Sequence, residues 1–401
     1  MIPRNPYFKK LVGVQESPIR ISVEKVITVL VFVIAIGMIS CVSKNGNHSG
    51  ITKERFGALP DGREVNLYTL QNRNSMKVKI SDYGCIVQSI IVPDRNEHFT
   101  DVVLGFDSLQ GYLKNNLYFG SIVGRYADRI ANGKFILDST EYSLEQNSFP
   151  NHLHGGVTGF DKVLWSAKEI ASPNYYTLQL TYNSPDGDQG YPGELKVKTT
   201  YKLNDNNELE IRYEAVTNKP TIVNLTNHTY FNLKDGGKSS ISDHFLVLNA
   251  DQFVPVNKLL IPIGGFRNCE GTPMDFRKSV SIGNRIESED EQIRFGNGYD
   301  HYWIVNRINQ QLVKAAIVNE PVTGRVLEVW TTQPAIHLYT GNFLNGTFKG
   351  KAGTIYQKRN GFCLETQHIA DSPNHLEFPS TILKPGEKYD YRTVFKFNVE
   401  K

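Results

Sequence analysis

The chain has 401 residues, of which 40% are hydrophobic and 11% aromatic, so it is long enough to bury a sizeable core. Its formal net charge is +3, and the first 40 residues carry five basic and two acidic side chains, which leaves the remainder neutral. A neutral chain without a basic patch is not typical of nucleic-acid binding, but it suits a small polar ligand without charge.

The N-terminal region contains an uncharged apolar run of 14 residues, 26–39, which a net-positive segment precedes and Ser40-Cys41 follows. The run is short for a membrane span, but its length and flanks fit a signal peptide. A small residue before Cys41 resembles the cleavage site of a bacterial lipoprotein. We therefore expect Cys41 to be lipidated and the protein to lie in a bacterial cell envelope, periplasmic or membrane-anchored. Because Met38 stands where leucine is usual, an uncleaved anchor is the alternative.

From residue 51 onward the sequence alternates like β-strands between turns rich in Gly, Pro, Asn and Asp. Helix patterns are sparse, and 20 tyrosines and 21 phenylalanines favour strands. We predict an all-β protein with an N-terminal signal segment at 1–40, a flexible tether at 41–50 and a single domain at 51–401. The clearest predicted strands are Leu67–Leu70, Met76–Ile80, Ile86–Val92, Asp101–Phe106 and Glu194–Leu203.

The spacing of the cysteines and histidines gives little indication of a metal site. Cys85, Cys269 and Cys363 remain after Cys41, an odd number without metal-ligand spacing, so we expect neither a disulfide framework nor a zinc knuckle. His152 and His154 could face the same way on a strand, which raises a zinc site, but no third ligand follows nearby. The two glycines after them either let backbone approach a ligand closely or form a plain turn.

Two arginines flank an aspartate in a mainly apolar stretch, 120–133. Arg125 and Arg129 offer planar forks of donors that suit vicinal hydroxyls or carboxylates. Pairing with Asp128 or with another acid is an equally ordinary structural role.

The stretch Asn224 to Leu233 places His228 within a strand-like run rich in hydrogen-bonding side chains. If the run is extended, Thr226, His228 and Tyr230 share an almost wholly polar face. That face either lines a polar cavity, where an imidazole could transfer protons near neutral pH, or belongs to a surface strand with a solvated histidine.

The last dense stretch is 361–368, where Phe362 and Leu364 share one face of a predicted strand and Glu365 lies on the other. Taken alone, Glu365 is most simply a surface carboxylate, because glutamate is usually exposed.

Together these segments resemble the aldose 1-epimerase family, also called galactose mutarotases, over nearly all of the chain from Phe56 to the C-terminus. Each motif is moderately specific, but their number and order make the likeness strong. The motifs are Gly-Arg-Tyr-Ala-Asp-Arg-Ile, Leu-His-Gly-Gly-Val-Thr-Gly-Phe-Asp-Lys-Val-Leu-Trp, Ser-Pro-Asp-Gly-Asp-Gln-Gly-Tyr-Pro-Gly-Glu-Leu, Asn-Leu-Thr-Asn-His-Thr-Tyr-Phe-Asn-Leu, Gln-Pro, Tyr-Thr-Gly-Asn-Phe-Leu and Leu-Glu-Thr-Gln. The resemblance implies a large antiparallel β-sandwich with few short helices and a sugar site in a cleft on one sheet.

Carried over by motif, the resemblance makes His228 the general acid and Glu365 the general base. Asp128 is a departure, because the family commonly has Asn before this arginine. Its carboxylate either pairs with Arg129 and weakens the arginine's hold on the sugar or accepts a sugar hydroxyl, and the sequence leaves both open. The substrate contacts that the resemblance implies are Asp128, Arg129, His154, Thr229, Tyr230, Asp300 and Gln333.

The implied reaction interconverts the α and β anomers of free aldohexoses such as glucose and galactose. A base takes the proton of the C1 hydroxyl while an acid protonates the ring oxygen, and the ring opens and closes again. This chemistry requires no cofactor. Some relatives are thought to use Ca²⁺, but the sequence shows no compact loop of oxygen ligands. We expect a monomer that binds a small aldose and contacts a membrane only through its N-terminal segment.

Three other functions compete with this interpretation. Asp300 and Glu365 could be the carboxylate pair of a glycosidase, which leaves His228 without a clear role. A sugar-binding lipoprotein without activity could use the same fold, although the presence of both His228 and Glu365 argues against it. A phosphosugar epimerase would need a cluster of basic groups, and none is evident.

Overall fold

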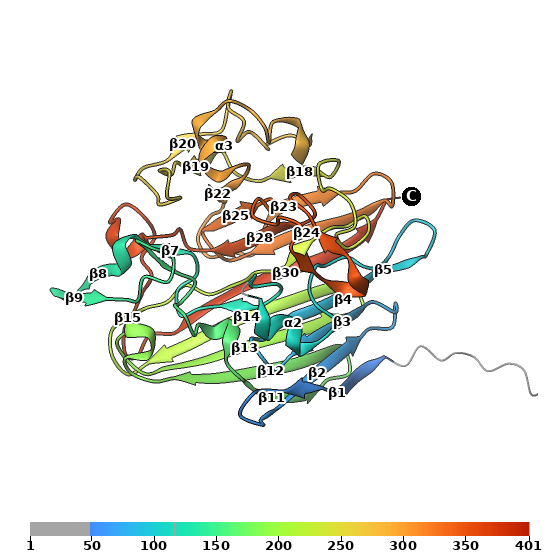
Figure 1. Cartoon of the computed structure of the whole chain (residues 1–401), viewed down its shortest axis with the longest axis horizontal. Helices are drawn as coiled ribbons and strands as arrows, with labels where there is room; N and C mark the ends of the chain where they lie inside the picture. The colour runs from blue at the N-terminus through green and yellow to red at the C-terminus, as the bar shows by residue number, and fades with distance from the viewer. Residues whose placement is uncertain (1–48, 116, 401) are drawn as a thin grey trace, which may run out of the picture. The chain divides into compact units, whose positions relative to one another are not determined.

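A computed structural model describes residues 49–115 and 117–400. These residues form antiparallel β-sheets with two short α-helices, α2 (Leu109–Lys114) and α3 (Glu291–Gly296) (Figure 1). The all-β prediction is therefore confirmed. Within the same ranges, no helix is long and apolar enough to cross a membrane. The predicted signal segment, Cys41 and all but the last two residues of the predicted tether lie outside the described residues.

A nine-stranded sheet forms one layer of the fold. Its order is β11-β12-β13-β14-β30-β24-β23-β18-β21, so the C-terminal strand lies at its centre. In that order the strands are β11 (Ser166–Ala171), β12 (Tyr175–Ser184), β13 (Leu195–Asn204), β14 (Glu208–Thr217), β30 (Tyr389–Val399), β24 (Arg325–Thr331), β23 (Val313–Asn319), β18 (Phe245–Leu248) and β21 (Val280–Ser281).

Two smaller sheets share a core with the nine-stranded sheet. The five-stranded sheet contains β1 (Gly50–Ala58), β2 (Glu64–Gln71), β3 (Lys77–Ser81), β4 (Val87–Pro93) and β5 (Phe99–Asp101) in chain order. The six-stranded sheet contains, in spatial order, β17 (Tyr230–Phe231), β28 (Phe362–Gln367), β25 (Ala335–Tyr339), β22 (Asp300–Ile304), β19 (Gln252–Val254) and β20 (Arg267–Asn268).

Short two-stranded ladders complete the described strands. The pairs are β6 (Ile122–Val123) with β16 (Thr226–Asn227), β7 (Arg129–Ile130) with β10 (His152–Leu153), β8 (Lys134–Leu137) with β9 (Thr140–Ser143), β15 (Thr221–Ile222) with β29 (Ile382–Leu383), and β26 (Phe348–Lys349) with β27 (Ile355–Tyr356).

One hydrophobic cluster joins the three sheets. Ile80 of β3, Ile211 of β14 and Leu364 of β28 all belong to it and are fully or almost fully buried. Alternating side chains on each strand supply this core, because one face of each sheet turns inward. The packing is that of the expected sandwich. The opposite face of the six-stranded sheet does not belong to this core.

Four of the five predicted strands are confirmed, with ends that differ by one to three residues, in β2, β3, β4 and β13. The fifth prediction, Asp101–Phe106, is wrong for most of its length. β5 ends at Asp101, and beyond it the backbone bonds to another segment, with the amide of Leu104 donating to the carbonyl of Tyr230 at 2.9 Å. The apolar residues after Asp101 are buried although they do not belong to β5. Their apolar character indicated burial, not a longer strand.

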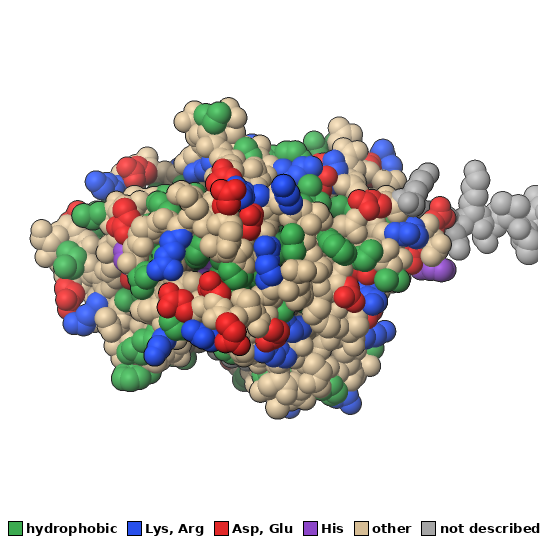
Figure 2. All heavy atoms as spheres, turned by 90° about the horizontal axis from the view of Figure 1, so that it is seen from above, with side chains coloured by type: hydrophobic (Ala, Val, Ile, Leu, Met, Phe, Trp, Pro, Cys, Tyr) green, Lys and Arg blue, Asp and Glu red, His purple; other side chains and the backbone are tan. Residues whose placement is uncertain are grey.

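Figure 2 shows one face of the molecule, on which basic and acidic side chains are interspersed. On that face they form no continuous basic patch of the kind that follows a nucleic-acid backbone.

The first glycine after His154 is needed for backbone packing. Gly155 has a φ of +81°, and an added Cβ would lie 1.9 Å from the carbonyl oxygen of Gly124. No side chain fits at that distance, so close contact between two chain segments explains this residue.

We predict that Gly155→Ala destabilises the protein far more than Gly187→Ala. Gly187 has nearly the same φ, +84°, but nothing lies within 4 Å of its added Cβ. Gly187→Ala should therefore lower the free energy of unfolding only by the penalty of a left-handed alanine, about 1 kcal/mol. Gly155→Ala adds a backbone clash and should lower it by about 3 kcal/mol or more. Urea unfolding of both variants measures the difference, and equal losses would show that the segments move apart freely.

Candidate active site

The candidate active site lies on the face of the six-stranded sheet that turns away from the main core. Because side chains alternate along a strand, β28 places Phe362 in the core and Glu365 on the opposite face. In β25 the same alternation places Ile336 in the core and His337 on the face with Glu365. The functional side chains therefore stand on neighbouring strands whose positions the ladder fixes.

A pocket with a cavity volume of about 160 Å³ opens on this face. Aromatic residues, among them Tyr339 and Phe343, form part of its wall, and Phe343 is largely exposed. Seven of the sequence-predicted site residues line the pocket: Asp128, Arg129, His154, His228, Tyr230, Asp300 and Glu365.

His228 and Glu365 face each other in this pocket. Nε2 of His228 lies 3.6 Å from Oε1 of Glu365, and their side chains are only 6% and 2% exposed. The imidazole stacks on the ring of Tyr230, with centroids 5.1 Å apart. Nδ1 of His228 lies 3.4 Å from the buried thiol of Cys363, so each ring nitrogen has a different neighbour.

Two alternatives that the sequence left open are wrong. The stretch 224–233 is not one surface strand but contains the short strands β16 and β17, and all ten of its residues are buried. The prediction failed because neighbouring segments cover both faces of the run. Glu365 is likewise not a surface carboxylate, since β28 is buried along its whole length.

His337 connects the pocket's carboxylates. It lies directly opposite Glu365 on β28 and opposite Tyr302 on β22. Its Nε2 is 3.0 Å from Oδ1 of Asp300, and its Nδ1 is 3.4 Å from Oε1 of Glu365. Burial alone would lower the pKa of His337, but the hydrogen bonds to Asp300 and Glu365 raise the pKa to about 10.

The opposite wall of the pocket comes from β7 and β10, which hold Arg129 and place His154. The amide of Asp128 donates to Nδ1 of His154 at 3.1 Å, and the amide of His154 donates to the carbonyl of Asp128 at 3.0 Å. Burial, and next the nearby His228, holds the pKa of His154 well below its ordinary value. A neutral His154 whose Nδ1 accepts a hydrogen bond carries its proton on Nε2.

Asp128 pairs with Arg129, one of the two roles that the sequence left open. Its Oδ1 accepts from Arg129 at 2.8 Å, and its Oδ2 accepts from the hydroxyl of Tyr302 at 2.5 Å. Burial by itself raises the pKa of Asp128, but the charges of Arg129 and His337 lower it to about 2. Both carboxylate oxygens therefore have protein partners.

Two predicted substrate contacts do not line the pocket. The hydroxyl of Thr229 donates to Oδ1 of Asn227 at 2.6 Å, because alternation turns Thr229 away from His228. Gln333 is fully buried just before β25, where its amide donates to the hydroxyl of Tyr389 at 3.1 Å.

Two other residues that the sequence raised as candidates also lie elsewhere. Arg125 donates to the carbonyls of Pro192 and Gly193. His152 does not face the same way as His154, because β10 ends at Leu153 and His154 has a φ of +50°. The ring nitrogens of His152 contact the carbonyl of Glu145 and the hydroxyl of Tyr191, so His152 and His154 cannot form the zinc site.

Sequence reasoning missed His337 and Tyr302. His337 lies two residues before the motif Tyr-Thr-Gly-Asn-Phe-Leu that the resemblance used, and it shares a strand face with Tyr339, which is the signal that could have indicated it. Tyr302 lies two residues after Asp300 and therefore on the same face of β22.

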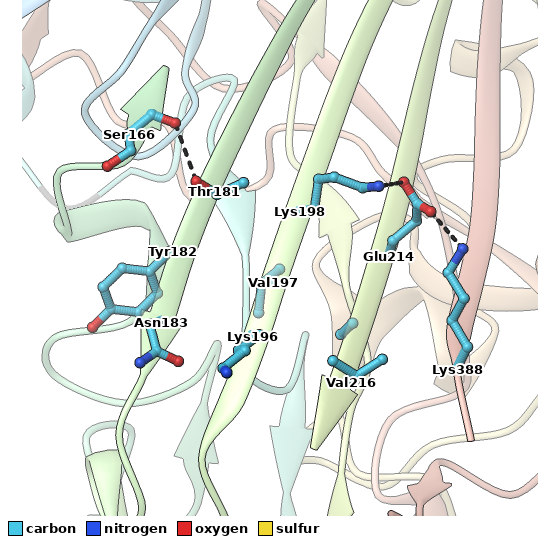
Figure 3. Close-up of a pocket in the computed structure, with 11 residues that line it drawn as sticks. Ser166, Thr181, Tyr182, Asn183, Lys196, Val197, Lys198, Glu214, Val216 and Lys388 are labelled. Atoms are coloured by element: carbon cyan, nitrogen blue, oxygen red, sulfur yellow. Dashed lines mark hydrogen bonds and ion pairs between the residues drawn. The ribbon is translucent and has the colours of Figure 1, made fainter. Parts of the chain in front are cut away.

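A second hollow, with a larger volume of about 600 Å³, lies over β12, β13 and β14 (Figure 3). Its central carboxylate, Glu214, is bonded to Lys198 at 2.7 Å and Lys388 at 2.6 Å. No histidine lines this hollow. Burial raises the pKa of Glu214, but the two lysines outweigh it and lower the pKa. The smaller pocket, where histidines meet carboxylates, is better suited to proton transfer near neutral pH.

A family model described as aldose 1-epimerase matches residues 66–396. The chain belongs to the aldose 1-epimerase family. The galactose mutarotase of Bos taurus is 46% identical over 350 residues, which cover 87% of this chain and 99% of that protein. The aldose 1-epimerase of Escherichia coli is 37% identical and covers 85% and 97% of the two chains.

Solved structures agree with this membership. A galactose 1-epimerase structure from Lactobacillus acidophilus superimposes with a TM-score of 0.79 and 31% sequence identity, covering 88% of this chain and 100% of that chain. This aldose 1-epimerase is thus an isomerase that interconverts the α and β anomers of aldoses. The described pocket is the place on its fold where buried acids and bases converge.

We predict that Asp128→Asn lowers the stability of this aldose 1-epimerase near neutral pH, with a loss that shrinks in acid. Because the folded pKa of Asp128, about 2, lies below its unfolded value, the stabilisation is present above about pH 4 and is lost as the pH falls toward 2. The expected loss at pH 7 is about 2 kcal/mol or more. Urea unfolding between pH 2 and 7 measures it.

Asp61→Asn is the matched control, since Asp61 also pairs with an arginine, Arg63, but is exposed. This change should alter stability little. An Asp128→Asn loss that stays constant from pH 7 to 2 would contradict the ionic role of Asp128.

Proposed function

We propose that His228 and Glu365 catalyse the anomer exchange as general acid and general base. The observation that carries the proposal is the 3.6 Å separation of Nε2 of His228 from Oε1 of Glu365 within a buried pocket. The C1 hydroxyl and the ring oxygen of an aldose are bonded to the same carbon. A donor and an acceptor this close together can therefore serve both oxygens of one bound sugar.

In the proposed reaction, Glu365 takes the proton of the C1 hydroxyl while the protonated His228 donates a proton to the ring oxygen. The bond between C1 and the ring oxygen breaks, and C1 becomes an aldehyde. Rotation about the bond between C1 and C2 turns the other face of the carbonyl toward the hydroxyl just formed. On closure His228 takes that hydroxyl's proton, and Glu365 returns its own to the carbonyl oxygen.

Three other residues are proposed to bind the sugar. His154 presents a proton on Nε2, which suits a ring or hydroxyl oxygen. Arg129 keeps donors for sugar hydroxyls, since only its Nη1 is bonded to Asp128. Asp300 can accept from a hydroxyl through the oxygen that His337 does not contact.

The glycosidase alternative fits the geometry less well. Asp300 and Glu365 are both in contact with the imidazole of His337, which lies between them. Two carboxylates of a glycosidase must instead flank the bond to be cleaved with space for the sugar between them.

Calcium does not fit the pocket's donors. The oxygens of Asp128, Asp300 and Glu365 that have a protein partner face Arg129, Tyr302 or a histidine. One further group, His228, Cys363 and Glu365, brings nitrogen, sulfur and oxygen together, whereas calcium prefers oxygen ligands alone. The proposed proton transfers need no cofactor.

We propose free galactose and glucose as substrates, because the relatives named above are galactose mutarotases and aldose 1-epimerases. Polarimetry of the fresh α anomers measures the rate directly. His228→Asn and Glu365→Gln should each lower kcat/KM by about 10²- to 10⁴-fold, because each removes one proton-transfer group.

The matched controls for these variants are His368→Asn and Glu328→Gln, since both positions lie outside the pocket. They should retain the parent's activity once folding is verified. Activity within a few fold of the parent in either pocket variant would reject that residue's role. No acceleration by the parent on any aldose would reject the substrates.

We also propose that residues 1–40 are a lipoprotein signal and that Cys41 becomes the lipidated first residue, with 41–50 as a tether and the catalytic domain as a monomer. The support is the apolar run 26–39 followed by Ser40-Cys41. In a bacterial host, Cys41→Ser should shift the full chain from the processed, membrane-bound form to an unprocessed one, which fractionation and mass spectrometry detect. An unprocessed parent that is still membrane-bound would favour the uncleaved anchor.

A further inference from the structure

The imidazole of His337 lies between two carboxylates, and this position fixes its protonation. Nε2 faces Asp300 at 3.0 Å and Nδ1 faces Glu365 at 3.4 Å. A neutral imidazole has only one N–H, so one of its nitrogens would turn a lone pair toward a carboxylate oxygen. Only the imidazolium donates to both. All three side chains are at most 7% exposed, so water screens the contacts weakly.

The surroundings hold this ring in place. The phenol of Tyr302 stacks on it, with centroids 4.5 Å apart and planes inclined by 24°. The hydroxyl of Tyr302 donates to Asp128 and accepts from the amide of Gln367 at 2.6 Å. His337 therefore has no freedom to turn away from Glu365 without breaking the stack.

The neighbouring charges favour a cation at this position. The titratable or charged groups around His337 are Asp300, His301 and Tyr302 on β22, Glu365 on β28, and Asp128, Arg129, His154 and His228 across the pocket. Burial lowers the pKa of His301 to about 4 and that of His154 well below its ordinary value, so neither contributes positive charge at neutral pH. Three carboxylates, those of Asp300, Glu365 and Asp128, thus act on this ring.

We propose that His337 is a positioning residue for the reaction, a permanent imidazolium between Asp300 and Glu365 that keeps the base ionised and aims it at the sugar. This inference rests on the proposed role of Glu365. Nδ1 of His337 and Nε2 of His228 both approach Oε1 of Glu365. They leave Oε2 as the oxygen that takes the proton of the C1 hydroxyl.

The fixed positive charge has a direct consequence for the pH dependence. Before each turnover the base must be ionised, and an opposite charge a few ångströms away favours the ionised form of a carboxyl. We therefore expect removal of the imidazolium to narrow the range of activity on the acidic side.

The first test is spectroscopic and does not depend on activity. In the full chain with ¹⁵N-labelled histidine, long-range ¹H–¹⁵N spectra at pH 8 should show that both ring nitrogens of His337 are protonated. Its signal is assigned by its absence in His337→Gln or His337→Lys. The buried His152, His244, His301 and His368, whose pKa values are lowered to about 3 or 4, should be neutral under the same conditions. A neutral His337 at pH 8 would overturn the proposal.

The second test is the pH profile of kcat/KM, after subtraction of the uncatalysed rotation. His337→Gln, which keeps a hydrogen-bonding group but no charge, should move the acidic limb upward by about one pH unit or more. His337→Lys, which restores a cation, should move the limb back toward the parent. His368→Gln, a matched change of a buried histidine outside the pocket, should leave the limb where it is.

These outcomes separate the two proposals. One outcome is that Glu365→Gln is inactive, while His337→Gln keeps the parent's acidic limb and changes only KM. His337 is then a sugar contact or a packing residue, and the inference about His337 fails without the assignment of the base. If Glu365→Gln keeps its activity, the assignment of the base fails, and the spectroscopic result still decides whether His337 is an imidazolium.

Discussion

The burial of three carboxylates in one small pocket is the constraint on which the rest of the site depends. A carboxylate removed from water is stable only with paired charges and hydrogen bonds. Asp128 has Arg129 and the hydroxyl of Tyr302. Asp300 and Glu365 share the imidazole of His337. Each of the three carboxylates therefore has a partner of opposite charge or a hydrogen-bond donor beside it.

The six-stranded sheet provides the rigidity that these pairs require. Tyr302, His337 and Glu365 are direct cross-strand neighbours on β22, β25 and β28, so the ladder fixes their order. The inward faces of the same strands belong to the main core. A shift of register by one residue would place Glu365 in the core and Leu364 in the pocket, and both changes would be costly. Core packing thus secures the alignment of the face that carries the pocket.

The sequence predicted the fold class and most strands well, because alternation and turn residues are local signals. It also divided β28 correctly into two faces, with Phe362 on one and Glu365 on the other. It could not predict that both faces are buried, since β25 and the segments near His228 cover Glu365 only in three dimensions. Local patterns therefore predicted correctly on which face of the strand Glu365 lies, but predicted wrongly that this face is exposed to solvent.

The errors at the site have the same physical origin. Thr229 follows His228 and was assigned to the sugar, yet adjacent residues in an extended chain point to opposite faces. Gln333 was chosen from the Gln-Pro motif, although β25 begins only at Ala335 and the position of Gln333 before it depends on the contact with Tyr389. The role of His337 depends on Asp300, 37 positions earlier in the chain, and no local pattern reveals that pairing.

The sum of charges explains why a protonated His337 suits a substrate without charge. With His228 protonated, the positive charges of Arg129, His337 and His228 balance those of the three carboxylates. When the ring opens, His228 loses a proton and Glu365 gains one, so the pocket stays neutral in the proposed mechanism. A neutral His337 would leave one uncompensated negative charge at both stages, in a site that water screens weakly. The proposed imidazolium thus accounts for how a pocket with three buried acids could receive and release a neutral sugar.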